Sequence, residues 1–195
     1  MPPLNHAVLS ASSAYRWLEC PPSALATADI PDETTIYAQE GSAAHEMAEY
    51  KIRWHLGAKD LAPPNVGNFN AEEIDRYTDS YAYYATDKIE TIRKICPDAI
   101  VMVEQRLDFS NYVKDGFGTG DLVIVADDVL QVIDFKYGKG VTVSAELNPQ
   151  MMLYALGALN LYGYLYDIKT VKTAIVQPRL DNISEWEISV DELLE

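Results

Sequence analysis

The stretch that most constrains the fold is residues 118–140, GTGDLVIVADDVLQVIDFKYGKG, in which two aliphatic, β-branched runs flank a pair of aspartates. Such runs around a two-residue polar turn predict a β-hairpin. Each run also carries an aspartate, Asp121 or Asp134, where the hydrophobic pattern would accept a valine, and Lys136 follows the second of them. These charges indicate that the hairpin does more than pair two strands.

The expected register brings the three charges together. A turn at the two central aspartates pairs Ala126 with Val129, and the same register continued along the strands places Asp121 opposite Asp134. Because side chains alternate along a strand, Lys136 lies on the same face as Asp134. Facing carboxylates repel each other, so the arrangement requires a nearby cationic side chain or a metal ion.

The ordinary alternative is a salt bridge in which Lys136 neutralises one aspartate. Apolar residues line both faces of the hairpin, however: Val123, Val125, Leu130 and Val132 share the face of the aspartates, and Leu122, Ile124 and Ile133 form the other. Carboxylates on a covered face are unfavourable without partners. We therefore interpret the group as a functional site that could bind a divalent metal such as Mg²⁺.

The segment before Ala99 has helical periodicity. Residues 10–20 begin with hydroxyl side chains suited to an N-cap and end before two prolines, residues 40–57 end at a glycine, and residues 71–96 end before Pro97. A connection is expected at residues 28–39, and a loop at residues 61–70. Tyr77, Tyr81 and Tyr84 are interpreted as packing residues of the third helix.

The segment after Ala99 changes to strand periodicity. Residues 99–109, 120–126 and 129–136 read as strands, residues 148–166 as a helix capped by Asn148, and residues 170–178 and 183–190 as further strands. The predicted class is α/β, of the α+β type with a mixed sheet. We expect one domain over residues 1–195, with a helical part at about 10–97 and the sheet and its helix at about 99–190.

Composition limits the kind of protein. Apolar residues make up 48% of 195 residues, enough for a core, and no stretch approaches the roughly 18–20 apolar residues that span a bilayer. The start lacks the features of a signal peptide, so we expect a cytoplasmic protein without membrane contact. The formal charge of −15 argues against non-specific binding of polyanions.

The order of several short motifs resembles the PD-(D/E)XK nuclease superfamily, in particular its RecB-like branch and the related phage and prophage exonucleases. The motifs are SAYRWLECP at residues 13–21, GSAAHE at 41–46, GTGD at 118–121, DFK at 134–136 and QMMLY at 150–154. The resemblance extends from about Ser10 to Leu194. It implies a restriction-endonuclease-like αβββαβ core with extra N-terminal helices, which agrees with the element order predicted above.

The resemblance also implies roles for individual residues. It makes His45, Asp121, Asp134 and the backbone carbonyl of Phe135 ligands of one or two Mg²⁺ or Mn²⁺ ions. Lys136 would position the attacking water or stabilise charge on phosphorus. Gln150 and Tyr154, one helical turn apart, would contact DNA or support the site. Glu104 is either an additional ligand, a supporting residue or a member of an ordinary salt bridge.

Many RecB-like nucleases hold an iron–sulfur cluster with one N-terminal and three C-terminal cysteines. Here Cys20 fits the first position, but Cys96 is the only other cysteine, so this chain does not support a cluster. The chain ends at VDELLE, about where the cysteine-bearing segment would begin. A fragment that lacks this segment and a branch without the cluster are both compatible with the sequence.

The implied function is metal-dependent hydrolysis of DNA, as an exonuclease in phage or prophage recombination or repair in a bacterial cell. Lys114, Lys136, Lys139, Lys169 and Lys172 would supply a local basic rim. Because the net charge is strongly negative, we expect modest DNA affinity and assistance from a single-strand annealing protein or from a homo-oligomer. The alternatives are a non-catalytic nuclease-like binding protein and an acidic inhibitor that mimics DNA.

Overall fold

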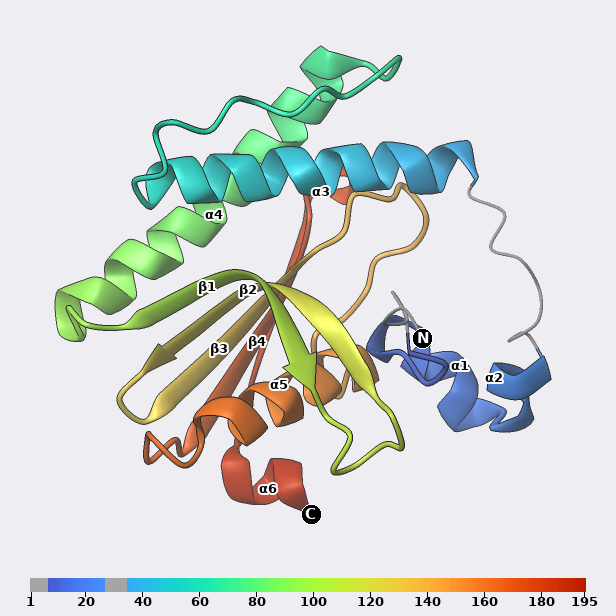
Figure 1. Ribbon diagram of the computed structural model, residues 1–195, viewed down its shortest axis with the longest axis vertical. Helices are drawn as coiled ribbons and strands as arrows, with labels where there is room; N and C mark the ends of the chain where they lie inside the picture. The colour runs from blue at the N-terminus through green and yellow to red at the C-terminus, as the bar shows by residue number, and fades with distance from the viewer. Residues whose placement is uncertain (1–6, 27–34) are drawn as a thin grey trace.

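The computed structural model of the protein describes residues 7–26 and 35–195, which form a five-stranded mixed sheet with helices on both faces (Figure 1). The helices are α1 Ala14–Glu19, α2 Pro22–Ala26, α3 Ile36–His55, α4 Ala71–Ile95, α5 Pro149–Tyr162 and α6 Val190–Leu194, with short 3-10 helices η1 Ala11–Ser13 and η2 Pro178–Leu180. The strands are β1 Ile100–Asp108, β2 Phe117–Ala126, β3 Val129–Phe135, β4 Thr170–Gln177 and β5 Asn182–Ser189. The predicted α+β class is confirmed.

The sheet follows chain order from β1 to β5. Neighbouring strands are antiparallel except for β3 and β4, which are parallel and joined through α5. The predicted hairpin register is confirmed, since Ala126 pairs with Val129 and the ladder continues to Leu122 and Ile133. The order of one helix group, three strands, one helix and two strands is also as predicted.

Each face of the sheet has its own core, and the predicted division of the hairpin residues is confirmed. Val123, Val125, Leu130 and Val132 pack toward α5. Leu122, Ile124 and Ile133 pack toward α3 and α4 on the opposite face. In Figure 1 the long helices α3 and α4 lie on one side of the sheet and α5 on the other. Side chains of these helices can therefore meet side chains of the hairpin from both sides.

The tyrosines of α4 have the packing role that the sequence predicts. Tyr81 is buried, and its ring stacks on Phe135 at a centroid distance of 4.6 Å. Tyr77 and Tyr84 are partly buried against the same core. At the other face, Gly157 of α5 lies so close to β1 that an added Cβ would be 3.0 Å from Leu107 Cβ. Glycine therefore permits the close approach of α5 to the sheet.

Several predicted boundaries were wrong. Helix α3 begins at Ile36, inside the expected connection, because Thr35 caps it by accepting a hydrogen bond from the Ala38 amide. The first helix is divided into η1 and α1 without the expected side-chain cap, and the Ser10 carbonyl instead accepts a hydrogen bond from Trp17 Nε1. Helices α2 and α6 were not predicted. The remainder of the expected connection, residues 28–34, lies outside the described residues.

None of the helices within residues 7–26 and 35–195 is long and apolar enough to cross a membrane.

The ends of α3 and α4 are joined to the sheet by a buried cation. The Arg179 side chain is 5% exposed and lies 3.2 Å from Glu40 of α3 and 2.8 Å from Glu73 of α4. Its guanidinium also lies 4.3 Å from the centre of the Tyr137 ring. Arg179 thus fixes both helices relative to the segment that follows β3.

We expect Arg179→Met to lower the free energy of unfolding by about 2 kcal/mol. Removing one partner of a buried ion pair costs more than this, but the two glutamates retain partial access to water, which reduces the loss. Urea denaturation would measure the change. The control is Lys172→Met, because Lys172 and Glu187 form an exposed pair that should contribute less than about 1 kcal/mol. Equal losses in both variants would contradict the assignment.

Candidate metal and catalytic site

Three carboxylates lie in a row across neighbouring strands. The β1–β2 ladder pairs Val103 with Leu122 and Gln105 with Gly120 but omits the pair between them, Glu104 and Asp121. The β2–β3 ladder likewise ends one position before Asp121 and Asp134. Asp121 therefore lies where β2 is not laddered to either neighbour, between a glutamate on one side and an aspartate on the other.

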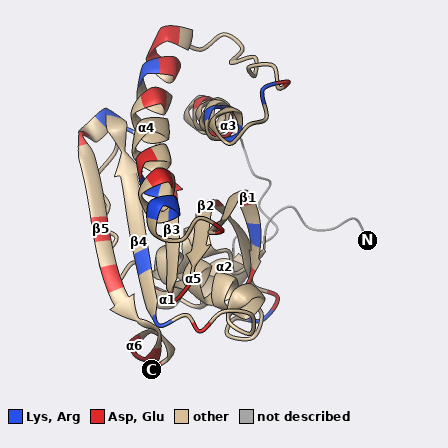
Figure 2. Ribbon diagram, turned by 90° about the vertical axis from the view of Figure 1, so that its left-hand side faces the viewer, with Lys and Arg blue, Asp and Glu red and all other residues tan. Residues whose placement is uncertain are grey.

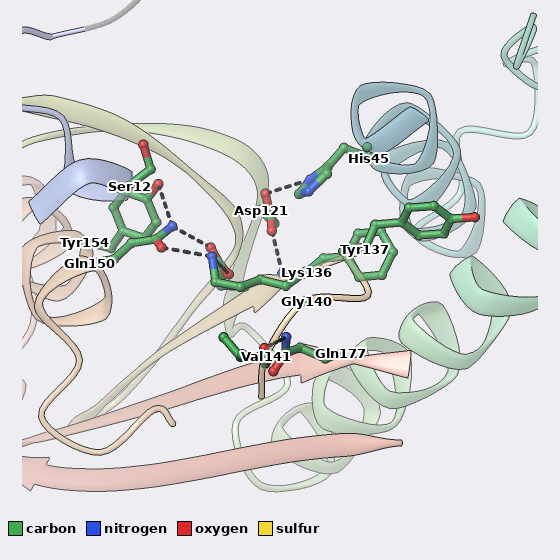
Figure 3. Close-up of a pocket in the computed structure, with 14 residues that line it drawn as sticks. Ser12, His45, Asp121, Lys136, Tyr137, Gly140, Val141, Gln150, Tyr154 and Gln177 are labelled. Atoms are coloured by element: carbon green, nitrogen blue, oxygen red, sulfur yellow. Dashed lines mark hydrogen bonds and ion pairs between the residues drawn. The ribbon is translucent and has the colours of Figure 1, made fainter. Parts of the chain in front are cut away.

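Asp121 is held from two directions. One carboxylate oxygen, Oδ2, accepts a hydrogen bond of 2.6 Å from the Phe135 amide. The other, Oδ1, is 3.3 Å from His45 Nδ1, so α3 contacts the sheet at this point. The His45 ring also packs against the Phe135 ring at a centroid distance of 5.1 Å. Figure 3 shows both contacts of Asp121 as dashed lines, with His45 entering from the α3 side.

His45, Glu104 and Asp121 could together bind a metal ion. One potential ligand atom from each lies within 4.8 Å of the others. Burial raises the pKa of Glu104 to about 7, and the charge of Asp121 contributes to the rise. Burial works against the charged form of His45, but the carboxylate of Asp121 outweighs it and raises the pKa of His45 to about 9. Without a metal, a protonated His45 therefore supplies part of the positive charge that these acids require.

Asp134 belongs to a second network on the side of α5. Its Oδ1 accepts a hydrogen bond of 2.9 Å from Gln150 Nε2, and its Oδ2 is 2.9 Å from Lys136 Nζ. Lys136 Nζ also donates to Gln150 Oε1 at 2.9 Å, so lysine, amide and carboxylate form a closed triangle. Burial raises the pKa of Asp134 to about 6, opposed by the neighbouring Lys136 and assisted by Asp121.

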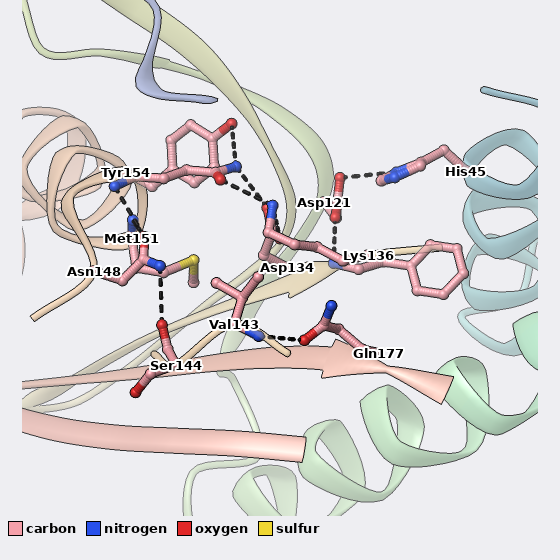
Figure 4. A network of polar contacts seen from close by, with 12 residues as sticks. His45, Asp121, Asp134, Lys136, Val143, Ser144, Asn148, Met151, Tyr154 and Gln177 are labelled. Carbon is pink, nitrogen blue, oxygen red and sulfur yellow. Dashed lines mark hydrogen bonds and ion pairs between the residues drawn. The ribbon is translucent and has the colours of Figure 1, made fainter. Parts of the chain in front are cut away.

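The remaining predicted residues take defined places around this network. Tyr154 is buried and accepts a hydrogen bond of 3.3 Å from Gln150 Nε2, so it supports the glutamine (both labelled in Figure 3; Tyr154 also in Figure 4). Gly118 makes room for Tyr154, because an added Cβ would be 2.7 Å from the tyrosine ring. Phe135 reaches the site through its amide and its ring. Its role as a carbonyl ligand stays a prediction.

Asp121, Asp134 and Lys136 open into a pocket of about 480 Å³. Its lining comes from distant parts of the chain and includes Ser12, Gly41, His45, Tyr137, Val141 and Gln177 (Figure 3). Gln177 is buried and holds one wall, since it accepts a hydrogen bond of 2.7 Å from the Val143 amide and donates one of 3.1 Å to the Val141 carbonyl. The segment after β3 is thereby fixed beside β4.

The expected basic rim is largely neutralised. Lys139 pairs with Glu73, Lys169 with Asp167 and Lys172 with Glu187, and Lys136 belongs to the site itself. Figure 2 shows Lys and Arg interleaved with Asp and Glu along α4, while β5 carries acidic bands beside a basic one on β4. The rim was predicted from the positions of the five lysines in the sequence, which do not reveal that three of them, Lys139, Lys169 and Lys172, pair with acids.

Sequence reasoning missed Arg179, Gln177 and Arg53, although each contacts the site or its walls. Their partners are far away in the chain: Arg53 Nη2, for example, donates to the Val103 carbonyl at 2.9 Å. No local pattern marks such residues.

Of the two cysteines, Cys20 is exposed and Cys96 is buried, where its thiol donates to Asp98.

The comparisons with known proteins give one family and distant structural matches. A solved structure titled "Crystal structure of SSO0001" is 17% identical to this chain. The match covers 90% of this chain and 77% of that one. Its TM-score of 0.28 is too low to support any inference about this protein. The family described as "Protein of unknown function (DUF2800)" matches residues 6–195. The chain therefore belongs to the DUF2800 family.

Proposed function

We propose that this protein is a metal-dependent DNA nuclease of the PD-(D/E)XK type, close to the RecB-like branch. The observation that carries the proposal is the adjacency of two groups: His45, Glu104 and Asp121 within metal-binding reach of one another, and Asp134 bound to Lys136. The αβββαβ order supports the proposal, since the motifs that resemble this superfamily occupy matching places in it. Exonuclease action in phage or prophage recombination or repair is part of the proposal.

The residues present fit a divalent cation. Two carboxylates and one imidazole form a mixed oxygen and nitrogen donor set. Burial and mutual repulsion destabilise the ionised acids, so a bound cation would stabilise them. Because a histidine binds metals only when neutral, binding at this site would release a proton from His45. Mn²⁺ and Mg²⁺ are the ions to test first.

When bound, a divalent cation would polarise a phosphate oxygen and lower the pKa of water. The chain's own residues would supply the rest. Lys136 places an ammonium beside the site, where it would stabilise negative charge that develops on the phosphoryl oxygens. Gln150 and Asp134 hold that ammonium in place through contacts of 2.9 Å each. Tyr154 in turn supports Gln150.

Recognition of DNA would need help from outside the site. Three lysines of the expected rim are already paired with acids, and the formal net charge is −15, so long-range attraction to phosphate is weak. We therefore retain the expectation of a partner such as a single-strand annealing protein, or of a homo-oligomer. The same charge favours the second candidate, a nuclease-like protein that binds without cutting or mimics DNA.

Cleavage of DNA tests the chemistry. We expect linear DNA to be degraded with Mn²⁺ or Mg²⁺ and not with chelator, and circular DNA to resist if the enzyme acts from ends. Lys136→Met should lose at least about 100-fold in rate, because it removes a charge that acts in the transition state. Lys94→Met, on an exposed part of α4, is the control. Cleavage by Lys136→Met at the parental rate would refute the role, and absence of cleavage under all conditions would favour the non-catalytic candidate.

Thermal melting tests the metal site independently of cleavage. Saturating Mn²⁺ should stabilise the parent, because an ion that binds only the folded state opposes unfolding, by about 2.7 kcal/mol at 100 times the dissociation constant. Asp121→Asn should lose most of this gain, because it removes the central ligand. Glu187→Gln, which changes an exposed acid, should retain it. A full gain in Asp121→Asn would exclude Asp121 as a ligand.

The pH dependence of melting tests whether burial and repulsion destabilise the ionised form of Glu104. The folded pKa of Glu104, about 7, lies above its ordinary value, so the protonated form favours folding and this stability is lost as the pH rises toward 7 and above. In chelator, Glu104→Gln should therefore melt increasingly above the parent between pH 5 and pH 8. With Mn²⁺ at pH 8 the variant should gain less than the parent. A difference independent of pH would contradict this account.

A further inference from the structure

Glu104 has an unusual backbone for a residue within a strand. Its φ is 53°, in the left-handed region. Among residues 7–26 and 35–195, the other non-glycine residues with positive φ are Asp115, Asp127, Leu147 and Asp181, and each of these lies in a turn, in a loop or at the end of a short helix. The left-handed conformation is strained for a non-glycine residue and persists only where surrounding contacts enforce it.

The contact that can enforce it comes from α3. Arg53 Nη2 donates a hydrogen bond of 2.9 Å to the Val103 carbonyl. This carbonyl belongs to the peptide unit that joins Val103 to Glu104, and φ of Glu104 is the rotation of that unit about the bond from nitrogen to Cα. A hydrogen bond that fixes the peptide unit therefore restricts the backbone rotation that sets the direction of the Glu104 side chain.

The arginine is itself oriented by the helix. Arg53 Nε donates to Glu49 Oε1 at 2.6 Å, one helical turn earlier. His45, Glu49 and Arg53 follow one another at intervals of four residues and so share one face of α3. The helix thus contacts the site at two points, with His45 against Asp121 and Arg53 against the peptide before Glu104.

We propose that Arg53 is a positioning residue of the metal site: by holding the Val103 carbonyl it keeps Glu104 in its left-handed conformation and its carboxylate within reach of His45 and Asp121. This inference rests on the proposed metal-binding function. Arg53 also favours the ionised form of Glu104 through its charge, in opposition to burial. Because the Arg53 side chain is 40% exposed, its ion pair with Glu49 contributes little to folding.

Calorimetric titration with Mn²⁺ tests the proposal in four proteins: the parent, Arg53→Met, Glu104→Gln and the double variant. Arg53→Met should bind Mn²⁺ about 10-fold more weakly, as is typical when a residue that orients a ligand is removed. Glu104→Gln should bind at least as weakly, because it removes the ligand carboxylate that Arg53 positions. Because Arg53 acts through Glu104, the double variant should bind no more weakly than Glu104→Gln alone. Arg53→Lys, which retains a donor, should recover part of the affinity, and Arg93→Met on an exposed face of α4 should bind like the parent.

Two further measurements distinguish a positioning role of Arg53 from a role in folding. In chelator, Arg53→Met should melt close to the parent, since only a half-exposed contact is lost. Glu49→Gln leaves the arginine in place but removes the negative charge of its orienting partner. It should also weaken Mn²⁺ binding, by less than Arg53→Met does, and serves if Arg53→Met does not fold.

Parental affinity in Arg53→Met, or independent and additive losses in the double variant, would overturn the role of Arg53 while leaving the metal site intact. A parent that binds no Mn²⁺ would overturn the metal site as well, so the two failures can be told apart.

Discussion

The charge balance of three adjacent acids is the constraint on which this structure depends. Glu104, Asp121 and Asp134 occupy neighbouring positions on three strands, where burial and proximity make simultaneous ionisation unfavourable. Two cations compensate, His45 beside Asp121 and Lys136 beside Asp134. Such an arrangement is a poor way to stabilise a sheet, because apolar residues of similar size would do so without desolvating charges. It is well suited to receive a divalent ion.

Helices on opposite faces of the sheet contact the two halves of the site. His45 comes from α3, which packs on the core that contains Leu122 and Ile133, whereas Gln150, which holds Lys136, comes from α5 on the other core. The acids lie where the strand ladders are interrupted, so both sets of side chains can reach the same place. A two-sided sheet is therefore a requirement of the site as well as of the fold.

The polar contacts around the site divide into those that support the proposed metal ligands and those that shape the pocket. Gln150 contacts Asp134 and Lys136, and Arg53, in its proposed role, positions Glu104; these are residues expected to bind metal or phosphate. Arg179 and Gln177 act on the surroundings, since one joins α3 and α4 to the segment after β3 and the other fixes that segment against β4. Both kinds use arginine or glutamine, whose several polar atoms can bond to more than one element at once.

The sequence by itself determined the α+β class, the hairpin register, the two faces of the hairpin and the proximity of Asp121, Asp134 and Lys136. These features follow from local patterns, because strand alternation and a two-residue turn fix the relative positions of residues that are within about 15 of one another in the sequence. The boundary of α3 and the short helices α2 and α6 were not determined, because single caps and terminal turns decide them.

Only the tertiary structure decided that Glu104 joins His45 and Asp121, that three rim lysines are neutralised, and that Arg53 and Arg179 reach the site or its walls. Arg53 and Val103 are separated by 50 residues, and Arg179 and Glu73 by 106. Contacts between such distant residues depend on how helices dock onto the sheet, which is set by the packing of both cores together. Local sequence patterns do not predict how the helices dock.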